Sequence, residues 1–187
     1  PRFEEQGFQI LKVKPTFEYK RDINLWVTNN LLQTVKEVLA KVEDKTCFLF
    51  CNSTDTIYTL MKQLNILDKS AVFCSDKSVD KLKGLKFKSA YSTWGENNMK
   101  HYNWLTSRFY NAVDIEINEC PNVLLLTDCY MAGYTIFDPN TDIIQCAGRF
   151  RNGISSLYLI SNVNSNFPVQ NRDYLNGFIQ CSKNIYD

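Results

Sequence analysis

Residues 123–160 have the sequence VLLLTDCYMAGYTIFDPNTDIIQCAGRFRNGISSLYLI, in which two short apolar runs flank a helical segment. Val123–Leu126 gives the clearest strand signal in the chain, and Leu157–Ile160 gives the last one. Between them, Thr141 provides helix-starting chemistry, an apolar turn follows, and the segment ends at Gly153. A strand, a helix and a second strand in this order predict part of a parallel sheet.

The same alternation extends through the rest of the chain. Strands are predicted at Cys47–Cys51, Ala71–Cys74, Lys86–Ser92 and Tyr102–Thr106, and residues 8–27 favour one or two edge strands broken at Pro15. A helix is predicted after Asn29 or Asn30, another after Thr54 as its N-cap, and a short polar helix or turn over residues 75–85. We therefore expect an α/β fold with a parallel sheet of about six strands and helices on both faces.

Length and composition are those of a single globular domain that spans residues 1–187. Hydrophobic residues make up 44% of the chain and charged residues 22%, so most of it is expected to be ordered. We divide it into N-terminal strands at 1–30, a core at 46–161 and a polar tail at 162–187. The tail is expected to contain a short helix near residues 174–179, and to be partly mobile or to lie against the sheet edge.

Charge and cysteine content exclude several classes of site. A formal net charge of +1 gives no overall attraction to nucleic acid or to anionic membranes, so any site for a polyanion must be local. The longest apolar run is only a few residues, and we expect neither a transmembrane span nor a signal peptide. Seven cysteines without a CxxC pair favour free thiols in a reducing, cytoplasmic compartment. His101 is the only histidine, so no metal site is predicted.

Small polar side chains follow three of the predicted strands, where each strand leads into a helix or turn. These groups are Asn52-Ser53-Thr54, Thr106-Ser107 and Thr127-Asp128. In an open parallel sheet, ligands bind at the carboxyl ends of the strands, where exposed backbone amides attract anions. The same residue types also serve as ordinary helix caps. Three such loops in one sheet favour an anion site over caps alone.

Arg149 and Arg151 lie at the end of the predicted helix, beside Gly148. A planar guanidinium held in place can bind phosphate oxygens with two hydrogen bonds, and a small neighbour lets the ligand come close. The alternative is a solvated helix end, where arginine complements the negative end of the helix dipole. The chain has no GxxxxGK[ST] phosphate loop, no GxGxxG fingerprint and no serine nucleophile elbow. These absences argue against a self-sufficient NTPase and against a dinucleotide-dependent dehydrogenase.

The order of these motifs resembles that of the second, C-terminal RecA-like domain of superfamily-two (DEAD/DEAH-like) helicases and translocases, over roughly residues 47–160. CFLFCNST (47–54) resembles motif IV, YNWLTSRFYNAVDI (102–115) motif V, and IIQCAGRFRNG (143–153) motif VI. A rival alignment places motif V on LLLTDCYMAGYTI (124–136), with Thr127, Asp128 and Gly133 at the matching positions. We prefer the first alignment because it preserves the extra strand before motif VI and ends in an Asp-Ile pair.

The sequence departs from the motifs of this family at three positions. Ala112 stands where motif V usually has glycine, and Cys146 where motif VI often has arginine. Asn152 replaces the final arginine of the usual QxxGRxxR spacing, and Arg151 lies one place earlier. A shift of one residue turns a helical side chain by about 100°, so Arg151 reaches a nucleotide only if the helix has already ended. Which of the two arginines acts as the finger is left open.

The resemblance implies a RecA-like sheet and a function shared between two domains. The chain would be the C-terminal motor domain of an ATP-dependent nucleic-acid helicase or translocase. An N-terminal RecA-like domain of the same polypeptide would carry the phosphate loop and bind most of the ATP with its Mg²⁺. Pro1 in place of methionine favours such a longer polypeptide. Without a phosphate loop, this domain alone is expected to be inactive as an ATP hydrolase.

The resemblance also implies roles for single residues. Arg149 and Arg151 would be catalytic and stabilise charge that develops on the γ-phosphate in the transition state. The residues implied to bind ATP are Gln145, Gly148 and Asp114. The residues implied to hold phosphates of single-stranded or duplex nucleic acid, without reading its sequence, are Asn52, Ser53, Thr106 and Ser107.

Two other functions are compatible with the same residues. The first is a non-catalytic helicase-like module that binds nucleic acid or a partner protein, which the departures at Ala112, Cys146 and Asn152 favour. The second is an unrelated doubly wound α/β domain in which the arginine-bearing helix matches by chance. A phosphate loop elsewhere in the polypeptide would favour the motor domain over both of these alternatives. No membrane partner is expected.

Overall fold

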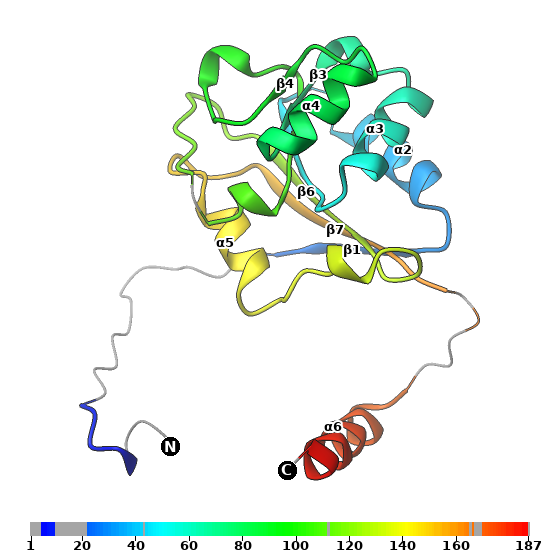
Figure 1. Ribbon diagram of the computed structural model, residues 1–187, viewed down its shortest axis with the longest axis vertical. Coiled ribbons are helices and arrows are strands. Elements are labelled where there is room, and N and C mark those ends of the chain that lie inside the picture. Colours follow the sequence, from blue (N-terminus) through cyan, green and yellow to red (C-terminus); the bar gives the residue numbers. More distant parts are fainter. Residues whose placement is uncertain are drawn as a thin grey trace.

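The computed structural model describes residues 5–9, 22–42, 44–111, 113–164, 166 and 170–186. At its centre, seven parallel strands form one sheet in the order β1-β7-β6-β2-β5-β3-β4 (Figure 1). The strands are β1 (Asn24–Thr28), β2 (Cys47–Phe50), β3 (Ser70–Phe73), β4 (Ala90–Tyr91), β5 (Tyr102–Leu105), β6 (Asn122–Asp128) and β7 (Ser156–Asn162).

Helices alternate with these strands along the chain. They are α2 (Leu31–Lys41), α3 (Thr54–Gln63), α4 (Asp76–Gly84), α5 (Asp142–Gly148) and α6 (Arg172–Tyr186). Short 3₁₀ turns complete the connections: η1 (Leu67–Lys69), η2 (Glu96–Asn98), η3 (Ser107–Phe109) and η4 (Gly133–Thr135). In Figure 1, α6 lies below the sheet and apart from it.

Two apolar cores lie on the two faces of the sheet, because successive residues of a strand point to opposite sides. Leu49 of β2 belongs to the core that α2, α3 and α4 cover. Phe48 and Phe50 of the same strand belong to the other core, which α5 and η3 cover. All four residues of β2 are fully buried. The continuous apolar run CFLF therefore suits a strand that is covered on both faces.

The predicted fold class is confirmed, with seven strands in place of about six. The predicted strand at 86–92 is reduced to the two residues of β4 at the sheet edge. Asn30 caps α2 as predicted, since its side chain accepts a hydrogen bond from the amide of Gln33 at 3.1 Å. The prediction that Thr54 caps α3 is wrong by one residue. Ser53 is the cap, because its hydroxyl accepts from the amide of Thr56.

At both ends of the chain, the observed elements differ in length from the predicted ones. Of the strands expected over 8–27, β1 begins at Asn24, and Pro15 lies outside the described residues. The helix expected near 174–179 is longer and covers all of α6. Ala112 also lies outside the described residues. Among the helices that the structure describes, none is long and apolar enough to cross a membrane.

Candidate functional site

Arg149 is fixed at the end of α5 by three hydrogen bonds. Its Nε donates to the backbone oxygen of Gln145 at 3.1 Å and its Nη2 to the side-chain Oε1 of Gln145 at 2.9 Å. Its Nη1 donates to the backbone oxygen of Asn111 at 3.3 Å. Only 17% of the Arg149 side chain is exposed. The guanidinium is therefore held in one orientation by the helix and by the segment that follows β5.

Arg151 lies beyond the helix, whose last residue is Gly148. The backbone around it pairs with Ile115, which donates its amide to the oxygen of Arg149 at 2.8 Å and accepts from the amide of Arg151 at 3.2 Å. The helix has thus ended before Arg151, which is the condition that the shifted spacing required. Its side chain is half exposed.

Phe150 lies between the two arginines and anchors this segment to the core. Its ring is buried and meets the ring of Phe48 edge-on at 4.8 Å between centroids. The backbone turns here, since Arg149 has helical φ and ψ of −68° and −25° and Phe150 forms a single parallel bridge with Ile115. Arg149 and Arg151 still lie on the same outer surface, because both side chains reach Asp114.

Asp114 joins the two arginines. Its Oδ1 accepts from Nη2 of Arg151 at 2.6 Å and lies 3.7 Å from Nη1 of Arg149. Asp114 and Arg151 are each about half exposed, and ion pairs at such positions contribute only ~0–1 kcal/mol to stability. One carboxylate beside two guanidiniums leaves one net positive charge. A phosphate can therefore displace the carboxylate from Arg151 at low cost.

An open hollow of about 310 Å³ lies over this cluster, lined by Asn111, Val113, Asp114, Arg149 and Arg151. Gly148 is not among its lining residues. It lines a separate, mainly apolar hollow with Ile144, and a Cβ atom added there would meet no atom within 4 Å. Two guanidiniums at fixed positions in the open hollow are suited to binding the oxygens of a phosphate.

The remaining predicted residues gather in a second group, at the carboxyl ends of β2 and β5. Asn52 connects two loops there, because its Oδ1 accepts from the amide of Ser107 and its Nδ2 donates to the oxygen of Tyr134, both at 3.3 Å. Ser107 is exposed. Ser53 and Thr106 are buried, with Ser53 serving as the α3 cap and the Thr106 hydroxyl donating to the oxygen of Phe73 at 3.4 Å. Asn52 and Ser107 are thus the members of this group whose side chains a ligand could contact.

One stretch of chain links the two groups. It begins at Thr106 and Ser107 and ends at Asn111 and Asp114, whose oxygens bind the arginines. In the rival alignment, Asp128 takes the place of Ser107. Its Oδ1 accepts from the amides of residues 130 and 131 and from the side chain of Asn162, and no bond to either arginine occurs in the part of the chain described.

Two of the motif departures have structural roles. Cys146 is fully buried on the inner side of α5, and its side chain packs in the same core as Phe48. Asn152 donates to the backbone oxygen of Ile117 at 2.8 Å and so ties down the loop after the arginines. Neither side chain is placed to bind a ligand. The oxygen of Asn111, which orients Arg149, had no sequence signal because it belongs to the backbone.

The cysteines support the prediction of free thiols. All seven are unpaired, and burial raises the pKa of Cys47 and Cys51 to about 12 and that of Cys74 to about 11. Such thiols stay protonated and are poor nucleophiles and poor metal ligands. No cluster of three or more potential metal ligands occurs within the described ranges.

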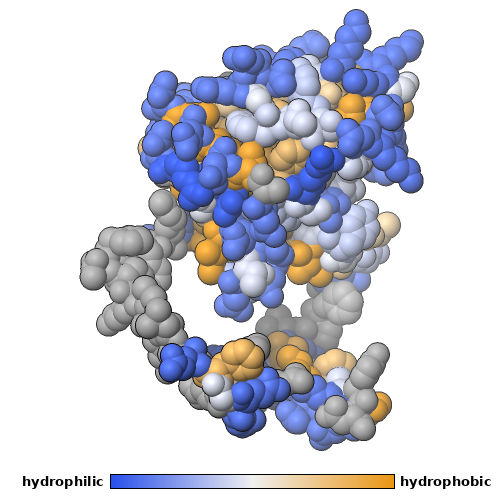
Figure 2. All heavy atoms as spheres, turned by 60° about the vertical axis from the view of Figure 1, so that its left-hand side comes forward, coloured by the Kyte–Doolittle hydropathy of each residue, from blue (hydrophilic) through white to orange (hydrophobic). Residues whose placement is uncertain are grey.

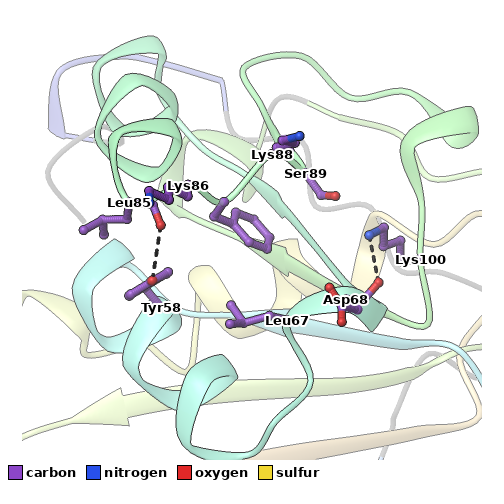
Figure 3. A pocket seen from close by; sticks show the side chains of 9 residues that line it. Tyr58, Leu67, Asp68, Leu85, Lys86, Lys88, Ser89 and Lys100 are labelled. Carbon is purple, nitrogen blue, oxygen red and sulfur yellow. Dashed lines mark hydrogen bonds between the residues drawn. The ribbon is translucent and has the colours of Figure 1, made fainter.

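A separate hollow of about 430 Å³ lies at the amino ends of β3 and β5 and contains lysines that the sequence analysis did not single out (Figure 3). Lys100 donates to the backbone oxygen of Asp68 at 2.8 Å, and the Tyr58 hydroxyl donates to the oxygen of Leu85 at 3.4 Å. Lys86 and Lys88 complete its basic lining. None of the predicted site residues lines it.

Comparison with known proteins gives no assignment. No protein-family profile matches the chain, and no curated protein matches it.

Proposed function

We propose that this chain is the second RecA-like motor domain of an ATP-dependent nucleic-acid helicase or translocase. The observation that carries the proposal is the cluster of Arg149, Arg151 and Asp114 beside an open hollow. One arginine is fixed by a helix end and the other is free to exchange its carboxylate for a phosphate. A partner domain with a phosphate loop would supply ATP and Mg²⁺ to this surface.

The geometry supports different roles for the two arginines. Arg151 is the more exposed and has one hydrogen bond to a side chain, so we assign it as the finger that reaches the γ-phosphate. Arg149 is nearly covered and rigid, so it would bind a second phosphate oxygen at a fixed place. Gln145 would act by holding Arg149.

The second group would hold the nucleic-acid strand. The exposed hydroxyl of Ser107 and the amide of Asn52 lie at the carboxyl edge of the sheet, where phosphates of a strand backbone are suited to bind without sequence readout. The connecting stretch 106–114 would couple the two sites, since movement of its first residues displaces the oxygens that hold the arginines. We also place the protein in the cytoplasm, where its free thiols stay reduced.

The test is ATP hydrolysis by the full-length protein, with and without single-stranded DNA or RNA. Arg151→Ala should lower the stimulated kcat by roughly 10³-fold or more, since an arginine finger contributes about 10³ to 10⁵ in rate. Arg172→Ala removes an exposed arginine of α6 and serves as the matched control. Strand binding without any hydrolysis by the wild-type protein would contradict the motor and favour the non-catalytic module.

A further inference from the structure

Within the part of the chain that the structure describes, one edge of the sheet is uncovered on the face that carries α5. Leu25 and Val27 of β1 are 60% and 64% exposed. The strand register aligns Leu25 with Leu159 of β7 and Leu159 with Leu125 of β6. Leu125 lies in the core beneath α5, and residues aligned across neighbouring strands point to the same face. The exposed side chains of β1 therefore continue this core outward, and none of the described residues covers them.

The bare region continues to the helix beside it. Ile23, just before β1, and Ile144 of α5 are also exposed, and both line a hollow of about 240 Å³ whose other walls are mainly apolar. We name Ile23, Leu25, Val27, Ile144 and Leu159 the open strip. All-parallel sheets are normally covered on both faces, so a strip of this kind needs an occupant.

Helix α6 has a matching apolar side. At about 100° per residue, one side of the helix collects the apolar residues and the other the polar ones. The apolar side contains Tyr174, Leu175, Phe178, Ile179, Cys181 and Ile185. The polar side contains Arg172, Asp173, Asn176, Gln180, Lys183 and Asn184. All of these side chains are exposed in the structure.

The two surfaces are close along the chain. Strand β7 ends at Asn162, which aligns with Thr28 at the end of β1, so the chain leaves the sheet beside Val27. Residues 163–171 separate β7 from α6 and can span up to ~30 Å. Figure 2 shows hydrophobic atoms at the surface both on the underside of the sheet-bearing body and on the part below it that contains α6.

We propose that the open strip is the docking surface for α6 of the same chain, which packs its apolar side over β1 and β7 and beside α5. A 15-residue helix alone is marginal in water, and packing of an amphipathic side supplies most helical stability in proteins. The docked helix, ~22 Å long, covers the length of a five-residue strand. It also contacts Ile144, and so supports the helix that ends in the arginine cluster. The docking does not depend on the proposed motor function.

The test is hydrogen exchange of the α6 amides in the 187-residue chain. Docking predicts exchange slowed by at least about tenfold, the factor that corresponds to ~1.4 kcal/mol. Leu25→Asp, on the sheet, and Phe178→Asp, on the helix, should each remove this protection. Ile144→Asp provides a second variant away from β1, and unchanged protection of the β6 amides shows in each case that the sheet is folded.

Two substitutions serve as controls. Leu85→Asp changes an exposed apolar residue next to α4, and Asn176→Asp changes the polar side of α6, and both should leave the protection unchanged. Rapid exchange throughout α6 in the wild-type chain would overturn the proposal, as would protection that survives both Leu25→Asp and Ile144→Asp. Protection that increases with protein concentration would also overturn it, because it would identify a second copy of the chain as the occupant.

Discussion

Replacement of Phe150 by alanine should separate the two arginines from their anchor and lower the stability of the whole domain. The ring is 4% exposed, meets Phe48 at 4.8 Å and 78°, and lies 6.3 Å from Phe50 at 85°. The backbone on both sides is bonded to Ile115. Removal of the ring therefore leaves a cavity against the centre of β2, where the surrounding strands cannot collapse.

The expected loss is ~3–5 kcal/mol in the free energy of unfolding, the range for a buried phenylalanine changed to alanine. Edge-to-face ring pairs contribute ~0.5–1.5 kcal/mol of this. Phe150→Leu keeps an apolar side chain of moderate size, so it should cost clearly less than the alanine variant. A domain with ~5–15 kcal/mol of stability remains largely folded in the milder variant.

Urea unfolding of the 187-residue chain, followed by tryptophan fluorescence, measures both values. A loss below ~1 kcal/mol for Phe150→Ala would refute the reasoning, because surface substitutions typically have effects of that size. Equal losses for the alanine and leucine variants would contradict the cavity argument, because leucine fills part of the space although it lacks the ring.

Three further predictions concern the helix ends and the thiols. Lys86, just after α4, has a φ of 65°, and this left-handed conformation costs most residues ~1–2 kcal/mol. Lys86→Gly should therefore stabilise the domain by about 1 kcal/mol in urea unfolding. Asn65→Gly, at a φ of 56°, should stabilise it by less, because asparagine tolerates this conformation better. Gly148→Ala should leave the stability unchanged or raise it by up to ~1 kcal/mol in the same assay, because a Cβ atom there meets no atom within 4 Å and alanine favours a helix more than glycine does. Burial raises the pKa of Cys51 to about 12 from 9.0, so its contribution to stability is complete below pH 9 and decreases as pH rises toward 12. Unfolding free energies at pH 8.5 and 10 should therefore differ less in Cys51→Ala than in wild type.

The sequence predicted the strands best where a run of apolar residues had to be buried on both sides. The run CFLF at 47–50 and the run beginning at Val123 are such cases, and both became central strands. The segment 86–92 was predicted less well, because its lysines suit only a short pairing at the sheet edge. Ser53 and Thr54 are both good caps by residue type, and only the backbone shows which of them precedes the first helical turn.

The candidate site was predictable in its residues but not in its connections. The pattern of Arg149 and Arg151 beside small residues pointed to the surface where the structure brings both side chains to Asp114. The burial of Phe150 between the two arginines depends on a contact with Phe48, about a hundred residues earlier in the chain. Arg149 donates a hydrogen bond to the backbone oxygen of Asn111. Every residue has such an oxygen, so this contact carries no sequence signal.

The central claim is that Arg149 and Arg151 act on one phosphate, and a double-mutant cycle on the kcat of nucleic-acid-stimulated ATP hydrolysis tests it most directly. The cycle compares the full-length wild-type protein, Arg149→Ala, Arg151→Ala and the double variant. We predict a large loss in each single variant and a double variant scarcely slower than the slower single one, because residues that act as a unit are strongly non-additive. Single variants that hydrolyse ATP as fast as wild type would contradict the claim.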